Sequence, residues 1–417
     1  MKIWILSERR IIINTYIFFT NSIYGIGGSK NYCATKAKVL KESGWNVQIF
    51  SVCTGELFIN DLCEYEENVI PEIILPPFCY PQKVINRVIN KIESKVQQSF
   101  QIIIESHEMG LAAWGEIVAE KLSAKSIIFL LSEQPENEGI VYHNFGLFKV
   151  KRKEVAGIDD YSVIRMLGLH EVSCNYMSKL RASYDIRAAD VKTPFAEKLI
   201  TADYTIGIFG RIYKNSVLAA IKGVETFLSS HKKLSFQVIF IGGGYNKEET
   251  EILEPIERLC DNLVITGNIF PVPRILLQAC DVILASAGCA SAASLEGIPT
   301  IAIDCDDNKA IGFLRYDTNN STFRHGEEKK EIDVMIEKAL FDKKILEGMR
   351  HLSLPVVSYD DHFKFIENSE RNIEYYDWKQ EKKRMKSRLS RIVYTFFSFE
   401  VGRKVISFLS GNMKQSK

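Results

Sequence analysis

The stretch YTIGIFGR (residues 204–211) is an apolar run that ends in Gly210 and Arg211, and it decides the fold class. Three further runs repeat the plan: FQVIFIGGG (236–244), LVITG (263–267) and VILASAGCAS (282–291). A last run, TIAI (300–303), follows Gly297. Strand, glycine and helix repeated in this way are typical of a parallel α/β sheet, which gathers anion sites at the carboxyl ends of its strands. We therefore expect residues 204–304 to form an α/β half with such sites at one edge.

The N-terminal part of the chain shows the same plan more weakly. We expect a strand at 2–6, a glycine turn at 25–28, a helix at 29–43 and a strand at 45–52. A strand near 72–75 and a helix near 84–96 follow. The buried strand at 101–104 then delivers Glu105, His107 and Glu108 at its carboxyl end. These elements predict a second α/β half.

Length and composition limit the class of protein. The chain has 417 residues, of which 46% are hydrophobic, and this suits two domains and a tail. We predict domains at 1–190 and 191–365, and a helical tail at 366–417. The formal net charge of +1 gives no reason to expect nucleic acid as a partner. Nine cysteines without a Cys-x-x-Cys spacing indicate unpaired thiols in a reducing cytoplasm. No secretion signal or spanning segment is evident, which predicts a cytoplasmic protein.

Two cations follow the first strand of the second half. Arg211 comes directly after Gly210, and Lys222 precedes Gly223. Two cations near one sheet edge can neutralise a diphosphate leaving group without a metal. The small-residue loop at 286–291 adds exposed N–H groups that can hold an anion. The alternatives are solvated surface charges for the cations, and close packing of a helix on the sheet for the loop.

Candidate residues of the first half lie at the corresponding edge. The glycine turn, with Gly27 and Gly28, leaves helix N–H groups open to a ligand, or it is simply a tight turn. His107 could accept a hydrogen bond from a sugar hydroxyl or stabilise developing charge, or it is an ordinary loop histidine.

The C-terminal tail combines charge with aromatic side chains. Residues 379–391 hold seven positive side chains against Glu381, and the apolar segment IVYTFFSF (392–399) follows. Such a segment can lie in an anionic membrane interface, and we expect membrane-surface contact through residues 379–409. The alternative is a solvated helix face joined to a packing segment.

These residues resemble those of bacterial GT-B glycosyltransferases, and glycosyltransferase family 4 in particular. The sequence around Gly27-Gly28 and Gly44-Trp45-Asn46-Val47 resembles the family's glycine turn, helix and strand entry. Ser106-His107-Glu108 resembles the family's His-Glu, and Gly210-Arg211 with Lys222-Gly223 resembles its donor-diphosphate pair. The chain departs from the family pattern where two glutamates are normal, because Leu284 and Ala292 stand there; Glu296 is the nearest acid.

The resemblance implies a GT-B fold, which is α/β with two Rossmann-like domains and a cleft between them. It implies catalytic roles for His107, Arg211 and Lys222, and an acceptor side at Gly27, Gly28 and Glu108. The implied donor-binding residues are Gly210, Gly243, Gly267, Asn268, Ser286, Gly288, Ala290, Ser291 and Glu296.

The function implied is that of a hexosyltransferase-type glycosyltransferase. It would move a sugar from a nucleotide-diphosphate sugar to a lipid-linked precursor of a cell-surface polysaccharide, such as capsule, O-antigen or exopolysaccharide. The reaction would be retaining and metal-independent, with no cofactor, at the inner face of the cytoplasmic membrane. A non-catalytic GT-B partner that binds a glycan or supports an active transferase is the alternative, and a GT-B sugar epimerase is a third reading.

Overall fold

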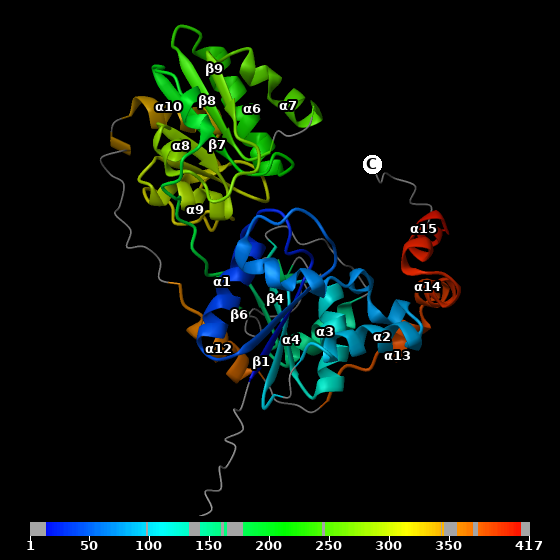
Figure 1. Cartoon of the computed structure of the whole chain (residues 1–417). Helices are drawn as coiled ribbons and strands as arrows, with labels where there is room; N and C mark the ends of the chain where they lie inside the picture. Colours follow the sequence, from blue (N-terminus) through cyan, green and yellow to red (C-terminus); the bar gives the residue numbers. More distant parts are fainter. Residues whose placement is uncertain are drawn as a thin grey trace, which may run out of the picture. The chain divides into compact units, whose positions relative to one another are not determined.

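The computed structural model describes residues 14–96, 99–132, 142–159, 162–164, 178–243, 247–342, 344–345, 357–369 and 374–409. The chain divides into two units (Figure 1). Unit 1 takes Met1–Tyr184 together with Ser358–Lys417, and unit 2 takes Asp185–Val357. The boundaries expected from the sequence, at residues 190 and 365, fall a few positions beyond these.

Unit 1 is built around a six-stranded sheet in the order β2-β1-β3-β4-β5-β6, in which every pairing is parallel. Its strands are β1 (Thr15–Thr20), β2 (Asn46–Ser51), β3 (Ile102–Ser106), β4 (Lys125–Leu130), β5 (Val155–Gly157) and β6 (Ser178–Lys179). Its α-helices before the junction are α1 (Gly28–Glu42), α2 (Gln82–Glu93), α3 (Met109–Leu122) and α4 (His143–Lys151). Short 3-10 turns lie at η1 (Asn60–Asn68), η2 (Pro71–Ile74) and η3 (Pro77–Cys79).

Two expected strands of unit 1 need comment. The strand expected at residues 2–6 lies outside the described residues, and the first described strand is β1, whose six side chains are all buried. The strand expected at 72–75 is wrong, because those residues form the 3-10 turn η2. Pro71 begins that turn and Pro76 follows it. Proline fixes φ near −65° and lacks an N–H, so this short apolar run cannot pair within a sheet.

Unit 2 contains a second six-stranded sheet in the order β12-β11-β10-β7-β8-β9, parallel except for the antiparallel pair β11 and β12. Its strands are β7 (Tyr204–Phe209), β8 (Phe236–Ile241), β9 (Asn262–Ile265), β10 (Val282–Ala285), β11 (Thr300–Ile303) and β12 (Ala310–Phe313). Its helices are η6 (Pro194–Lys198), α6 (Asn215–Ser230), α7 (Lys247–Glu257), α8 (Arg274–Gln278), α9 (Ala287–Leu295) and α10 (Ile332–Phe341).

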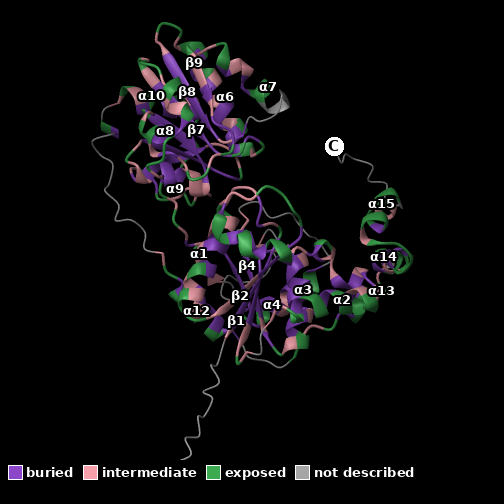
Figure 2. Cartoon of the chain, in the orientation of Figure 1, coloured by how far each residue is buried: buried purple, intermediate pink, exposed green. Residues whose placement is uncertain are grey.

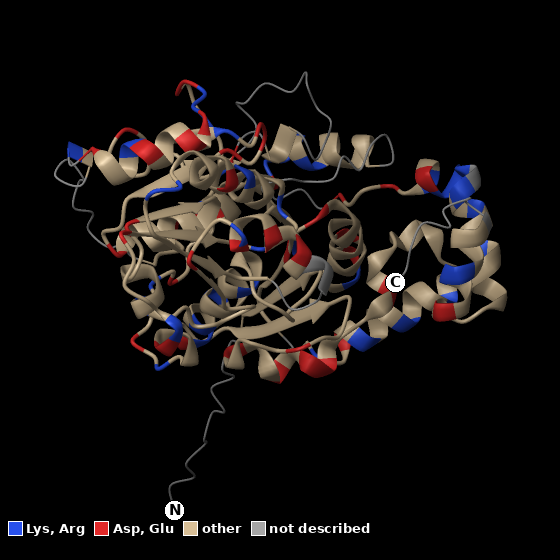
Figure 3. Cartoon of the chain, turned by 90° about the horizontal axis from the view of Figure 1, so that it is seen from above, with Lys and Arg blue, Asp and Glu red and all other residues tan. Residues whose placement is uncertain are grey.

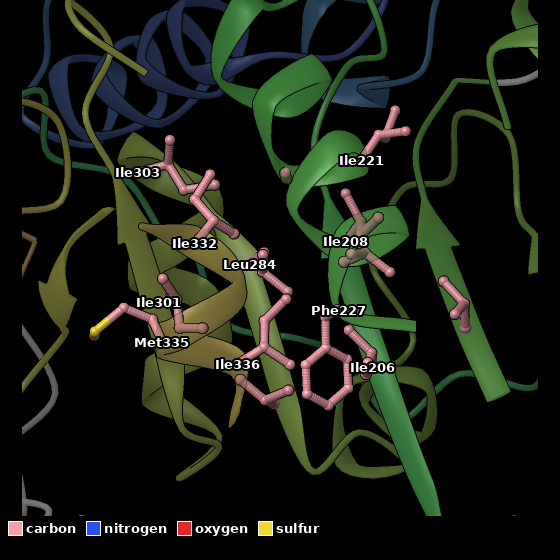
Figure 4. Packing of buried hydrophobic residues seen from close by; sticks show 14 of the residues in the cluster. Ile206, Ile208, Ile221, Phe227, Leu284, Ile301, Ile303, Ile332, Met335 and Ile336 are labelled. Atoms are coloured by element: carbon pink, nitrogen blue, oxygen red, sulfur yellow. The ribbon is translucent and has the colours of Figure 1, made fainter. Parts of the chain in front are cut away.

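Apolar side chains on both faces of each sheet explain why the strand runs are continuous rather than alternating. Both sheets are largely buried (Figure 2). In unit 2, Phe227 of α6 and Ile336 of α10 pack against Leu284 of β10 (Figure 4). A Cβ on Gly223 would stand 2.4 Å from Ile332 Cγ2, so this glycine lets α6 approach α10 closely. A parallel sheet covered on both faces requires such runs, and this is what made its strands predictable.

The C-terminal helices belong to unit 1. They are α12 (Asp360–Asn368), α13 (Lys379–Lys383), α14 (Met385–Phe396) and α15 (Phe399–Leu409). Trp378 packs with Phe78 and Phe145, and Tyr394 joins the core beside Tyr80. No described helix is both long and apolar enough to cross a membrane.

A backbone contact joins the loops that follow β7 and β8. Gly242 has φ +113°, and a Cβ added to it would lie 2.5 Å from the carbonyl oxygen of Gly210. The neighbouring Gly243, with φ +67°, is pressed against Ile212 in the same way. Glycine is therefore required here both by conformation and by the close approach of the two loops.

We predict that Gly242→Ala lowers the free energy of unfolding of unit 2 by more than about 2 kcal/mol, since it adds a clash to an unfavourable φ. Gly297→Ala is the matched control: φ is +82° there and no atom lies within 4 Å, so a loss of only about 1 kcal/mol is expected. Chemical denaturation followed by circular dichroism measures both. All four tryptophans lie in unit 1, so their fluorescence should not change. Equal losses in the two variants would contradict a role for the Gly210 contact.

Candidate functional site

The candidate site of unit 2 lies where its sheet reverses direction. From β7 the chain proceeds to β8 and β9 on one side, whereas β10, β11 and β12 lie on the other. The loops after β7 and β10 therefore diverge at the carboxyl edge, which is where open α/β sheets bind ligands. Ser216, in the first turn of α6, and Ser286, the N-cap of α9, are linked by a 3.0 Å hydrogen bond between their hydroxyls. Two helix N-termini thus meet at this edge and direct their N–H groups and positive dipole ends toward it.

Glycine loops form the rest of this edge. Gly210 follows β7 and donates its N–H to the carbonyl of Ile241 at 3.0 Å. Thr266, after β9, accepts a hydrogen bond from the N–H of Gly242 at 3.1 Å and donates to the Gly267 carbonyl at 2.8 Å. The structure therefore brings the predicted Gly210, Gly243 and Gly267 to one edge, and it places Asn268 next along the chain as an exposed residue.

The two predicted cations separate in the structure. Arg211 is exposed on the turn that follows β7, at the edge. Lys222 is the eighth residue of α6, about 10 Å along the axis from the helix start at 1.5 Å per residue. Its side chain is 73% exposed and pairs with Glu225 at 2.8 Å on the helix surface. The structure does not bring Lys222 to the loop that carries Arg211.

Sequence reasoning missed Lys214. This residue is the N-cap of α6, and its backbone N–H donates to the Arg211 carbonyl at 3.0 Å, so both cations share one turn. The signal was available in Asn215-Ser216, residue types that favour the start of a helix. Reading Gly223 as the opening of the next element concealed it, since that glycine serves packing against α10.

The loop after β10 divides between edge and core. Ser286 and Gly288 lie at the N-terminus of α9, and Ser291 returns its hydroxyl to the Ala287 carbonyl at 3.3 Å. Ala290 is fully buried in the core and packs helix against sheet, so its side chain does not face the edge. Ala287 has φ +52°, and its N–H donates to the Ser321 carbonyl at 2.6 Å. A left-handed alanine is strained, and such strain is often found at ligand sites.

No carboxylate of α9 reaches this edge. Glu296 is the C-cap of α9, roughly 13 Å along the axis from Ala287 at 1.5 Å per residue, and it pairs with Arg274 at 2.9 Å. Leu284 lies inside β10, and Ala292 faces the core. Leu284 and Ala292 are thus apolar packing positions, and Glu296 lies at the opposite end of the helix from the edge.

Unit 1 also reverses its strand order, between β1 and β3. Glu108, the N-cap of α3, accepts a hydrogen bond from the Asn21 side-chain amide just after β1. Gly27 and Gly28 begin α1, and a Cβ on Gly28 would lie 2.9 Å from the Tyr184 hydroxyl oxygen. The structure thus joins β1 and β3 at this edge through Asn21 and Glu108, and places Tyr184 over the start of α1.

A buried charged cluster lies beneath that edge. Lys36 Nζ and Glu105 Oε2 form an ion pair at 2.6 Å, and both side chains are fully buried. Lys36 also donates to the hydroxyls of Tyr16 and Tyr32, each at 2.9 Å, and these hydroxyls donate to Glu105. Burial opposes ionisation of Glu105, but Lys36 and the hydrogen bond from His107 outweigh it and hold the pKa of this carboxyl well below its usual range. Glu105 is therefore an ion in the core.

Two histidines contact this cluster. His107 is 4% exposed; its Nε2 lies 3.0 Å from Glu105 Oε1, and its Nδ1 lies 3.9 Å from Cys33 Sγ. The predicted catalytic histidine is thus held from both sides by protein groups. His362 of α12 donates from Nε2 to the Arg181 carbonyl at 2.9 Å, and its unprotonated Nδ1 lies 3.3 Å from Lys36 Nζ. Burial first, and Lys36 second, lower the pKa of His362 to about 4.

Within the described residues, no three His, Cys, Asp or Glu side chains gather so that they could hold a metal ion. The arrangement of the described residues offers backbone N–H groups and cations for an anion in unit 2, and a fixed polar edge above an ion pair in unit 1.

Comparison with known proteins identifies the fold. No family model matches the sequence, and no curated protein matches it. Among solved structures, a glycosyltransferase from Rickettsia africae has a TM-score of 0.54 at 14% identity, over 97% of this chain and all of that one. Two weaker similarities follow. A Neisseria meningitidis UDP-GlcNAc 2-epimerase bound to UDP-GlcNAc has a TM-score of 0.45 at 10% identity, over 81% of this chain and 94% of that one. An S. aureus TarM complex that contains UDP has a TM-score of 0.43 at 12% identity, over 67% of this chain and 54% of that one. The chain has the two-unit α/β fold of GT-B proteins.

We predict that Lys36→Met lowers the free energy of unfolding of unit 1 by about 3–5 kcal/mol, because it leaves the Glu105 charge buried without its partner. The double variant Lys36→Met/Glu105→Gln should recover part of this loss. Lys222→Ala removes an exposed pair instead and should change stability by less than about 1 kcal/mol. Urea denaturation is followed by tryptophan fluorescence for the Lys36 variants, which lie in unit 1, and by circular dichroism for Lys222→Ala, because unit 2 has no tryptophan. A loss no greater than that of Lys222→Ala would show that the cluster does not hold an ionised Glu105.

We predict that protonation of His362 makes the free energy of unfolding of unit 1 depend on pH. Its folded-state pKa of about 4 lies below the ordinary 6.5, so the unfolded state binds more protons between these values. The stabilisation is complete above pH 6.5 and is lost as pH falls toward 4, by up to about 3 kcal/mol. His362→Gln keeps a donor for the Arg181 carbonyl and should remove this part of the pH dependence. Identical stability–pH curves for variant and parent, by tryptophan fluorescence, would contradict it.

Proposed function

We propose that the chain is a glycosyltransferase that uses a nucleotide-diphosphate sugar, with the diphosphate bound at the edge between β7 and β10 of unit 2. The observation that carries the proposal is the meeting of α6 and α9 at Ser216 and Ser286, beside Arg211 and Lys214. Helix N-termini, glycine loops and cations together suit an anion with several oxygens. The similarity in fold to a glycosyltransferase supports the same reading.

The chemistry follows from where charge develops. When the bond between sugar and diphosphate breaks, negative charge grows on the departing diphosphate. Fixed N–H dipoles and the Arg211 and Lys214 cations would stabilise that charge without a metal. Both groups lie on structured turns, so little reorganisation accompanies the reaction. Lys214 takes the role that the sequence comparison had given to Lys222.

The acceptor would meet the corresponding edge of unit 1. Glu108 and Asn21 present polar side-chain atoms there, and Gly28 lets the Tyr184 hydroxyl lie close to the start of α1. His107, held by Glu105, would orient and polarise this edge rather than shuttle a proton freely. We propose a lipid-linked precursor of a cell-surface polysaccharide as the acceptor, a hexose as the donor sugar and retention of configuration, in keeping with the sequence resemblance.

A second function is favoured by one observation. With Leu284 and Ala292 in the core and Glu296 paired to Arg274, α9 offers no carboxylate to the hydroxyls of a ribose. A non-catalytic partner that binds a glycan or supports an active transferase would need none. Turnover of a nucleotide sugar by the purified chain would exclude this second function.

We predict that UDP, GDP, dTDP or CMP raises the melting temperature of the parent protein without added metal, since a ligand that binds only the folded state stabilises it by about 2.7 kcal/mol at a hundredfold excess over Kd. Arg211→Ala and Lys214→Ala should each remove most of the shift. Lys222→Ala, a matched lysine on the same helix, should retain it. Circular dichroism is the readout, because unit 2 has no tryptophan.

Two outcomes would overturn parts of this assignment. Loss of the shift in Lys222→Ala, with Lys214→Ala unaffected, would restore the diphosphate role first given to Lys222. No shift in the parent with any of the four nucleotides would favour the non-catalytic partner.

A further inference from the structure

Helix α14 has two contrasting faces. Toward the body of unit 1 it turns Ser387, Ser390 and Tyr394, all buried. On the opposite side, Leu389, Ile392 and Phe396 are 49%, 57% and 78% exposed. Their spacing of three and four residues places them in one stripe along the helix. An aliphatic and aromatic stripe exposed to this degree is unusual on a surface that contacts only water.

The orientation of this stripe is fixed by contacts on the buried side. The Tyr394 ring lies 4.7 Å from the Tyr80 ring, centroid to centroid, and fits over Gly402, where an added Cβ would come within 2.6 Å of it. Arg391 donates to the Phe78 carbonyl at 2.8 Å and to the Lys382 carbonyl at 2.6 Å. Helix α14 therefore cannot roll to bury the stripe without breaking these contacts.

Helix α15 also exposes apolar side chains. Val401 and Phe408 are seven residues apart and so lie on one face, 46% and 69% exposed, whereas Gly402 is buried against α14. Phe397, between the helices, is also exposed. We call this surface the apolar tail face; it consists of Leu389, Ile392, Phe396, Phe397, Val401 and Phe408.

Lys and Arg are frequent along the C-terminal helices that carry the apolar tail face (Figure 3). On α14, Lys386 and Arg388 are exposed and lie on either side of the stripe, at the angles that 100° per residue gives. Residues 379–409 hold nine basic and two acidic side chains, a net charge of +7, in a chain whose net charge is +1. The rest of the chain is thus net negative, and the positive charge is concentrated in this segment.

We propose that the apolar tail face rests in the interface of an anionic lipid bilayer. Leu, Ile and Phe would enter the boundary between headgroups and acyl chains, while Lys and Arg reach the phosphates beside them. A second copy of the chain is a poor occupant, because pairing two such faces would bring two +7 segments together. The sequence allowed either a packing segment or a membrane segment here. The buried face of α14 is the packing segment, and its exposed face is the one we assign to the membrane. This inference goes beyond the proposed function and applies equally to a non-catalytic chain.

The test uses the full chain and vesicle co-sedimentation. The parent should bind phosphatidylcholine vesicles that contain phosphatidylglycerol, and it should bind pure phosphatidylcholine vesicles much less. Its binding should weaken as the salt concentration rises. Ile392→Ser/Phe396→Ser should lower the partition coefficient by about tenfold or more. Lys386→Gln/Arg388→Gln should weaken binding to the phosphatidylglycerol vesicles alone.

Controls separate binding from folding. Val334→Ser/Ile252→Ser removes two exposed aliphatic side chains of unit 2 and should bind as the parent does. The unfolding midpoint of Ile392→Ser/Phe396→Ser, measured by tryptophan fluorescence, should equal that of the parent. Parent-like vesicle binding by Ile392→Ser/Phe396→Ser would overturn the proposal. A second outcome would also overturn it: the parent is a dimer, Ile392→Ser/Phe396→Ser is a monomer, and neither binds vesicles. That result would assign the face to self-association. Nucleotide binding is measured separately, so neither result bears on the edge between β7 and β10.

Discussion

The ion pair between Lys36 and Glu105 is the contact on which unit 1 depends. Two charges without water are costly unless every remaining donor and acceptor is satisfied. Here Tyr16 and Tyr32 accept from Lys36, and these hydroxyls and His107 donate to Glu105. The consequences extend in two directions. Toward the sheet edge, the ionised Glu105 holds the His107 ring beside Glu108. Toward the chain terminus, α12 must stay in place because it supplies His362.

The candidate edges of the two units differ in the groups that form them. Unit 2 relies on backbone: glycine loops in contact, two helix N-termini linked through serine hydroxyls, and cations on a single turn. Unit 1 relies on side chains that are fixed by a buried charge. A backbone edge suits an anion whose oxygens accept many N–H groups, whereas a side-chain edge suits neutral hydroxyls that both donate and accept. This difference fits the donor and acceptor edges proposed above.

The sequence predicted the α/β class and most strands, because strands buried on both faces leave continuous apolar runs that need no knowledge of distant contacts. The GT-B fold was implied by the family resemblance. The strand expected at 72–75 failed where Pro71 imposed a turn. Lys222 and Glu296 were misplaced for a different reason. Lys222 lies on the exposed surface of α6, away from the start of that helix, and Glu296 lies at the end of α9 that is far from the sheet edge. Lys36 could not be found, because its partners Glu105 and His362 lie far away along the chain. The roles of the edge residues themselves stay predictions.

Unit 1 is discontinuous, since its core includes Ser358–Lys417 as well as the N-terminal segment. During synthesis, unit 2 emerges whole while the first unit still lacks α12 and Tyr394. Lys36 and Glu105 must then wait, without His362 beside them, until α12 has left the ribosome. Unit 2 can therefore complete its core before unit 1 does. An unfinished N-terminal unit, exposing apolar strands, is the species that chaperones would meet.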